Sequence, residues 1–191
     1  STAEPQHVVY DIQKLRSLSP QHCTFVECES QTDLAILERM MANGRPLAGP
    51  DGAFSWRQGD FNMTSDREQF VLRSEAEARG FRRGGDGIWR NGGDGTDLMP
   101  LYQGAMVYDL HPNTGAHQSG VGHKTAWEQP SRHDELRPQY LVQARPWLVT
   151  AQERSPARIV LRALSNATNE RTAIACLLPD VPCGNSLGVL T

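Results

Sequence analysis

The chain has 191 residues, a length that suits one sizeable domain with or without a small extension. It is 38% hydrophobic and 21% charged, with 17 Gly and 12 Pro, which is typical of a globular, loop-rich chain and excludes a disordered or fibrous one. The net charge of -3 gives no general electrostatic attraction to nucleic acid, and no run of about 18 apolar residues predicts a membrane span.

The basic residues are nearly all arginine. Seventeen of the 19 are Arg, and only Lys14 and Lys124 are Lys. Residues 137–171 carry six Arg and two Glu, a local charge of +4 on an acidic chain. Because Arg makes forked contacts to phosphate and guanine, this segment predicts a local basic face.

The N-terminal part predicts one strand and one helix. Residues 6–12 are typical of a strand, and a helix is predicted over 32–42. Ser30 and Thr32 are good N-cap residues in front of that helix. The apolar residues at helical spacing that we expect to pack are Leu34, Leu37 and Met41.

Short elements follow. The pattern predicts a short strand over 53–57, a short helix over 66–72 and a further helical turn over 74–80. Residues 84–97 contain six Gly and three Asp, which indicates a connector at the tip of a hairpin.

The second half predicts β-structure. Strands are predicted over 98–110, 139–145, 158–163 and 171–178, and the last is expected to be central and buried because it is almost entirely apolar. The polar residues 111–134 show no clear period and predict a long surface loop.

These elements together predict an α+β fold. We expect a mixed or antiparallel β-sheet from about 98–178, an N-terminal helix at about 32–42 and long surface loops. Residues 1–48 are expected to form a strand and helix extension that packs on the rest, and 49–191 the main α+β domain. The missing initiator Met and the apolar end favour a fragment of a longer protein, and nothing suggests secretion.

Few residues match patterns for catalysis or metal binding. The chain has no P-loop, no Gly-x-Ser-x-Gly and no strand–loop–helix context for its Gly-rich segment. The four Cys have C-x4-C and C-x6-C spacing, which favours free thiols in a reducing cytoplasm over a zinc site. His111, His117 and His123 are expected to be solvated, with transition-metal binding as the alternative.

Two pairs of side chains have two interpretations each. Arg158 and Arg162 are expected to share one face of the strand over 158–163, where they are either solvated or bind phosphate. Tyr102 and Tyr108 are expected to share a strand face, and a half-buried core position is favoured over stacking on bases.

The turn over 166–172 also has two interpretations. For Asn166 and Thr168 we favour a structural role, in which their side chains bond the backbone of the turn. Arg162 and Arg171 are either structural or contact DNA.

Several strings resemble one bacterial protein family in order and spacing. Residues 61–66 resemble "D-M-T-N/S-D", residues 100–107 resemble "P-L-Y-E-G-K-M-I", and residues 162–172 resemble "R-D-I-A-N-A-T-N-E-R-T". Residues 173–179 resemble "A-I-A-A-I-L-P", and a Gly-Asn pair follows them. The strings are similar to those of large single-chain Type II (Type IIG-like) adenine-specific DNA methyltransferases of restriction-modification and phage-defence systems. The likeness covers about residues 54–188.

The chain departs from the family in two segments that carry charges there. The family's "E-G-K" is Gln103-Gly104-Ala105 here, without either charge. The family's "F-D-H-R" is the segment 109–113, which lacks the Arg. The Asn/Asp-Pro-Pro-aromatic loop and the glycine-rich cofactor strand of an adenine methyltransferase are absent from this chain.

The resemblance implies a target-recognition (specificity) region. We therefore expect a module that binds double-stranded DNA for a methyltransferase domain outside this chain, in the bacterial cytoplasm and with no membrane partner. The parent would use S-adenosylmethionine, with or without a nuclease, whereas this chain is expected to have no catalytic residue, metal or cofactor and no methyl-transfer activity. The residues assigned to DNA contact are Arg145, Arg158, Arg162, Arg171, Asn169, Lys124, Tyr102 and His111.

Two other functions compete with DNA recognition. The first is a scaffolding or interaction domain of the same methylase that does not bind DNA, which the net charge of -3 favours. The second is a small enzyme that uses the loop histidines. A concave positive surface would favour DNA binding, and an evenly acidic one would favour scaffolding.

Overall fold

The computed structural model of the chain describes residues 7–20, 23–48, 52–93, 95–131, 134–150, 154–166 and 168–191. The chain divides between Ala53 and Phe54 into two compact units, five residues beyond the boundary expected after residue 48. No helix within the described ranges is long and apolar enough to cross a membrane.

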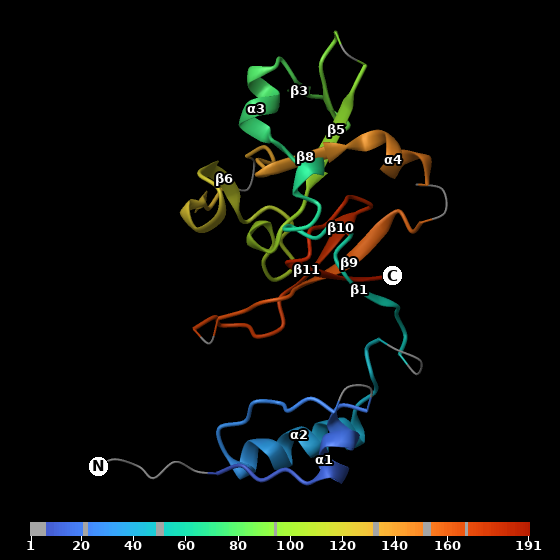
Figure 1. Cartoon of the computed structure of the whole chain (residues 1–191), viewed down its shortest axis with the longest axis vertical. Helices are drawn as coiled ribbons and strands as arrows, with labels where there is room; N and C mark the ends of the chain where they lie inside the picture. Colours follow the sequence, from blue (N-terminus) through green and yellow to red (C-terminus); the bar gives the residue numbers. More distant parts are fainter. Residues whose placement is uncertain are drawn as a thin grey trace, which may run out of the picture. The chain divides into compact units, whose positions relative to one another are not determined.

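The N-terminal unit contains two helices, α1 (Ile12–Leu18) and α2 (Gln31–Asn43), drawn in blue in Figure 1. Helix α2 confirms the helix predicted over 32–42. Ser30 and Asp33 form a capping box, in which each side chain accepts a hydrogen bond from the other residue's backbone N–H. The strand expected over 6–12 is wrong for residues 7–12, because Asp11 caps α1 by accepting a hydrogen bond from Lys14 N at 2.7 Å.

Helix α2 packs through only part of its expected apolar set. Leu34 is buried and Leu37 is half-buried, but Met41 is 48% exposed, so the expected packing of Met41 is wrong. Helix α1 has seven residues and is about 10 Å long, whereas α2 has 13 residues and is about 20 Å long. Residues 39–43, at the end of α2, are all exposed.

The C-terminal unit contains two antiparallel sheets and a separate two-stranded hairpin (Figure 1). The four-stranded sheet has the order β1-β11-β9-β10 and consists of β1 (Trp56–Gln58), β9 (Ala157–Arg162), β10 (Ala175–Pro179) and β11 (Leu187–Leu190). The five-stranded sheet has the order β2-β8-β5-β4-β3 and consists of β2 (Val71–Leu72), β3 (Arg82–Arg83), β4 (Trp89–Arg90), β5 (Asp97–Leu101) and β8 (Tyr140–Gln143). The hairpin pairs β6 (Ala116–Ser119) with β7 (Ala126–Glu128).

All pairings between these strands are antiparallel, and short helices join them. The helical elements are α3 (Arg73–Ala78), α4 (Ala144–Val149) and the 3-10 turns η1 (Arg67–Gln69), η2 (Gly104–Met106) and η3 (Gly122–Lys124). The predicted α+β class is therefore confirmed. Strands β1 to β4 and β11 lie outside the expected 98–178 range, and β5 also begins one residue before it.

Two predicted strands are shorter than expected. The strand over 98–110 ends at Leu101, because the chain turns into η2 where Gly104 N donates to Ser186 Oγ at 2.8 Å. The strand over 139–145 ends at Gln143, and α4 begins at Ala144. Pro146 lies in the first turn of α4, where no intrahelical bond needs its missing N–H.

Two further expectations about the second half are wrong. The loop expected over 111–134 contains β6, η3 and β7, held by pairs such as His117 with Trp127. The strand expected to be central, over 171–178, begins only at Ala175 and is the edge strand β10, with Leu177 62% exposed. The central strands of this sheet are β9 and β11, and β11 comes from the buried C-terminal run.

The described cysteines and histidines form no metal-binding cluster. Among the residues placed by the structure, no cluster of three or more His, Cys, Asp or Glu side chains is arranged to hold a metal ion. All four Cys are free. His111 is exposed, but His117 is 5% exposed with Nε2 2.9 Å from the Gly120 carbonyl oxygen, so its expected solvation is wrong.

The cysteines are predicted to react at very different rates. Burial raises the pKa of the Cys183 thiol to about 12 and also raises that of Cys176, so both remain protonated at pH 8, whereas Cys23 is exposed. We expect iodoacetamide to alkylate Cys23 first in the native chain and to reach Cys176 and Cys183 only after urea is added. Peptide mass spectrometry measures the order, and equal native rates for Cys23 and Cys183 would contradict it.

Candidate nucleic-acid interface

Three of the strings that carry the family resemblance meet in space. Phe61 forms a parallel bridge with Gly184, and Asn185 N donates to Phe61 O at 2.8 Å. Asn185 Oδ1 accepts a hydrogen bond from Met63 N at 3.3 Å, and Gly184 N donates to Tyr102 O at 2.8 Å. Backbone hydrogen bonds thus connect residues that are far apart in the sequence. The shared strings at 61–66, 100–107 and 184–185 form a structural junction.

Arg158 belongs to this junction and does not face solvent. Its side chain is buried, with Nη1 2.7 Å from Asp60 Oδ2 and Nη2 2.9 Å from Asp60 Oδ1, and Nη1 also donates to Val181 O at 2.7 Å. Burial acts to lower the pKa of Arg158, but its hydrogen bonds to Asp60 and nearby negative charges raise it, so the group stays charged.

The assignment of Arg158 to DNA contact is therefore wrong. Strand β9 buries Arg158 and Val160 and leaves Ile159 half-buried, which is the reverse of the expected alternation. The reason is the carboxylate of Asp60, which supplies a buried partner for an otherwise costly charge. A guanidinium enclosed in this way cannot reach a phosphate.

Tyr102 is also a core residue. It is 6% exposed and packs in the cluster around Met106, Val160 and Leu187, and burial raises the pKa of its hydroxyl to about 12. Tyr108 is half-buried but lies beyond the end of β5, so the two tyrosines do not share a strand face. No base can stack on the buried ring of Tyr102, and its assignment to DNA contact is wrong.

The described residues between β9 and β10 form an exposed arm, defined here as residues 163–166 and 168–173. Figure 1 shows it as the orange-red loop that extends away from the ends of these two strands. Leu164 is 82% exposed, and most other described arm residues are exposed too. The arm is closed by bonds from Ser165 Oγ to Thr172 O at 3.2 Å and from Asn169 N to Asn166 O at 3.0 Å.

Within the described residues, three polar side chains of the arm make no hydrogen bond. The hydrogen bonds within the described chain use the hydroxyl of Ser165 but not the side chains of Asn166, Thr168 or Asn169. The expected bonding of Asn166 and Thr168 side chains to the turn is thus not found among those residues. Such amides carry both a donor and an acceptor, which suits contact with base edges.

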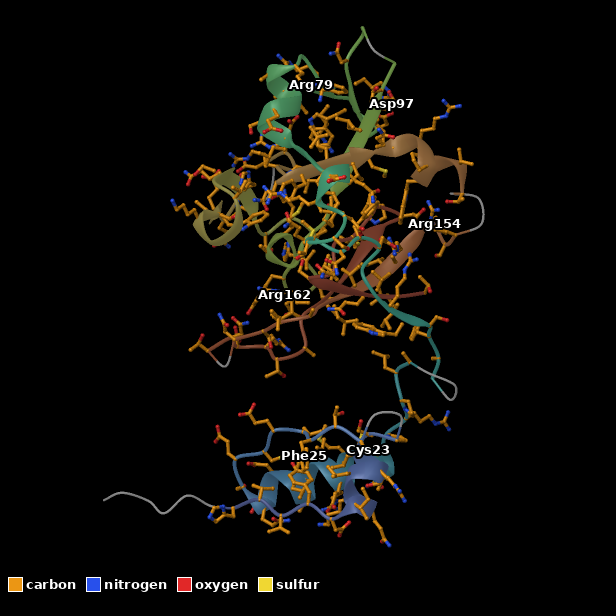
Figure 2. The ribbon with its side chains drawn as sticks, viewed as in Figure 1. Cys23, Phe25, Arg79, Asp97, Arg154 and Arg162 are labelled. Atoms are coloured by element: carbon orange, nitrogen blue, oxygen red, sulfur yellow. The ribbon has the colours of Figure 1, made fainter. Side chains whose placement is uncertain are left out.

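Two arginines flank the arm. Arg162 is half-buried at the arm's base, labelled in Figure 2, and lines a hollow of about 330 Å³ with Tyr108 and Gln129. It has no carboxylate partner within the part of the chain that the structure describes. The Nε of Arg171 lies 3.5 Å from Asp109 Oδ2, and its side chain is 60% exposed. This loose, exposed pair leaves Arg171 available.

The turn at 108–111 lies beside the arm. Tyr108 bridges to His111, and Leu110 N donates to Ala175 O of β10 at 2.8 Å. His111 is exposed there. The structure therefore brings together four of the assigned residues at one end of the four-stranded sheet. They are Arg162, Asn169, Arg171 and His111, and we call them with Asn166 the arm surface.

The remaining two assigned residues lie on other elements. Lys124 is exposed in η3, which joins β6 to β7, and Arg145 is exposed in the first turn of α4. Figure 1 shows β6 and α4 on opposite sides of the unit. Neither residue extends the arm surface.

A second basic cluster was not expected from the sequence. Arg73, Arg82, Arg83 and Arg137 line a groove of about 480 Å³ beside β3. The adjacent pair Arg82-Arg83 just before the Gly-rich hairpin was the signal that indicated it in the sequence. Arg73 and Arg137 are 64 positions apart, so only the fold reveals the cluster.

Comparisons with known proteins give no information about the function of this chain. The chain matches no protein-family model, no curated protein and no solved structure. The resemblance to the methyltransferase strings is therefore a basis for a proposal about function, and the arm surface is the feature to which it applies.

Proposed function

We propose that the chain is a DNA target-recognition module of a bacterial, cytoplasmic restriction-modification methyltransferase. It binds duplex DNA through the arm surface for an S-adenosylmethionine-dependent domain outside this chain. The observation that carries the proposal is the arm itself, in which Asn166 and Asn169 lie between Arg162 and Arg171 and make no side-chain hydrogen bond within the described residues. The order of the family strings supports the same function.

The chemistry of the arm suits both parts of DNA recognition. Arginines bind phosphate oxygens and fix the position of a protein on the duplex, while Asn side chains read adenine through its N6 and N7 atoms. Arg162 and Arg171 are suited to the first role, and Asn166 and Asn169 to the second. The overall charge of -3 does not oppose this, because binding depends on the local field.

The test of the proposal measures DNA affinity over a salt series. Arg162→Gln and Arg171→Gln are compared with the wild-type chain on a pool of random-sequence duplexes. If each Arg neutralises one phosphate, the slope of log K against log salt becomes shallower by about 0.9 in each variant. Arg90→Gln is the matched control, because Arg90 is exposed but paired with Asp86 at 2.7 Å and Asp97 at 3.4 Å.

Two outcomes would overturn the proposal. One is a wild-type chain that binds no duplex at low salt. The other is a slope that is the same in both arm variants and in the wild type while their circular dichroism shows intact folding. Methyl transfer and binding of S-adenosylmethionine by this chain alone are not part of the proposed function.

A scaffolding role is the second candidate, and the N-terminal unit favours it. Among its described residues only Leu15, Leu18 and Leu34 are buried hydrophobics. Large apolar side chains of the same unit are exposed, including Phe25 at 72% and Met40 at 64%. An apolar surface of this kind is typical of a site that another protein surface covers.

A further inference from the structure

The groove beside β3 is built from two walls. One wall is α3 with the edge strand β3, which contribute Arg73, Arg82 and Arg83, and the other is the segment before β8, which contributes Arg137. Arg73 ties the walls together, because its Nε donates to Pro138 O at 3.3 Å and its Nη2 donates to His117 O at 3.3 Å. The groove is therefore a fixed feature of the fold.

Two of the four groove arginines are neutralised within the chain. Arg73 Nη1 contacts both carboxylate oxygens of Glu77, at 2.8 and 2.9 Å. Arg137 forms an ion pair with Glu128 of β7. These two guanidinium groups shape the groove but offer little charge to a ligand.

The other two, Arg82 and Arg83, are held in place, and neither forms an ion pair with a residue that the structure describes. Arg82 Nη1 donates to the carbonyl oxygens of Glu77 at 2.8 Å and Phe81 at 2.7 Å, neither of which carries a full charge. The guanidinium carbon of Arg83 lies 5.7 Å from the ring centroid of Trp89, its partner across the β3–β4 pair. Trp89 is 2% exposed, so its ring is a fixed support.

Of the two acidic side chains among the described residues that line the groove, Glu77 is paired with Arg73 and Glu135 is not paired with an arginine. Glu135 is exposed. With Glu135 counted, the two uncompensated arginines leave an excess of positive charge. Fixed guanidinium forks with excess positive charge suit a phosphodiester, whose two free oxygens accept paired hydrogen bonds.

We propose that this β3 groove binds a phosphodiester of the DNA backbone through Arg82 and Arg83. The inference rests on the proposed function and adds a second, sequence-independent anchor away from the arm. An anchor of this kind fixes the protein on the duplex and leaves base reading to other side chains. Binding at the groove is then the same for all DNA sequences.

The test uses charge changes of opposite sign in the full chain. Arg82→Gln/Arg83→Gln removes both free charges, and the slope of log K against log salt on random duplexes becomes shallower by about 0.9 because one phosphate is no longer neutralised. Glu135→Gln removes the opposing charge and tightens binding at every salt concentration. Arg90→Gln on the neighbouring strand β4 is the control, because Arg90 is already paired with Asp86 and Asp97.

The outcomes separate this inference from the proposed function. If the arm variants weaken binding but the Arg82/Arg83 variant and Glu135→Gln match wild type, the groove does not bind DNA and only this inference fails. If the wild-type chain binds no duplex, both fail. A polyglutamate peptide that displaces duplex from wild type but not from the Arg82/Arg83 variant would reassign the groove to an acidic protein and overturn the inference.

Discussion

Asp60→Ala is expected to destabilise the C-terminal unit by about 3–5 kcal/mol, the cost typical of leaving one partner of a buried ion pair alone. Asp60 Oδ2 accepts hydrogen bonds from Arg158 Nη1 at 2.7 Å and from Cys183 N at 2.8 Å, and Arg57 also contacts Asp60 Oδ1. The Arg158 side chain is 1% exposed, so water cannot replace the lost carboxylate. Urea unfolding followed by tryptophan fluorescence measures the loss.

Two further variants make this prediction specific. Asp109→Ala removes an exposed partner of Arg171 and is expected to cost less than about 1 kcal/mol. Asp60→Leu/Arg158→Met replaces both charges by apolar side chains and is expected to recover most of the stability lost in Asp60→Ala. Equal urea midpoints for Asp60→Ala and Asp109→Ala would show that the buried pair does not stabilise the junction.

Gly59→Ala is expected to cost at least about 1–3 kcal/mol, the range for a non-glycine residue held in a strained backbone conformation. Gly59 has φ +64, which L side chains rarely adopt. A Cβ at this position would also lie 2.6 Å from the carbonyl carbon and oxygen of Gly184. Because both neighbours are backbone atoms of the junction, the strain can be relieved only by moving the chain segments apart.

Gly85→Ala is the matched control for this second prediction. A Cβ at Gly85 meets no atom within 4 Å, and its φ is not positive, so the substitution is expected to be neutral or to stabilise by up to about 1 kcal/mol. Both variants are compared with wild type by thermal unfolding. A Gly59→Ala chain as stable as Gly85→Ala would show that the close approach of Gly59 to Gly184 is not required.

The elements that the sequence predicted well depend on near neighbours. Helix α2 begins where Ser30 and Asp33 cap it, three positions apart, and the pattern of apolar residues marks the body of β9. The elements that were missed depend on distant partners. Leu187–Leu190 is a strand because β1 and β9 lie on either side of it, and its pairing with Trp56 spans most of the chain.

The residues of the candidate site also fall into those that local sequence indicated and those that a distant partner decided. Arg162, Asn169 and Arg171 were found from the Arg-rich segment and the family strings, and in the structure Arg162 and Asn169 are half-buried and Arg171 is exposed. Arg158 has the same residue type and lies on the same strand as Arg162, but it is buried. The difference is its partner Asp60, 98 positions away, which no local pattern indicates.

By itself the amino-acid sequence determined the α+β class, the capped helix α2 and the Arg-rich region, because caps, periodicity and composition act over a few residues. Only the tertiary structure decided which arginines face solvent, that β10 is an edge strand and that the arm stands clear of the sheets. The physical reason is that burial and charge pairing depend on side chains brought together from distant positions. The groove arginines show this most clearly: Arg73 and Arg137 pair with Glu77 and Glu128, whereas Arg82 and Arg83 form no ion pair within the described residues.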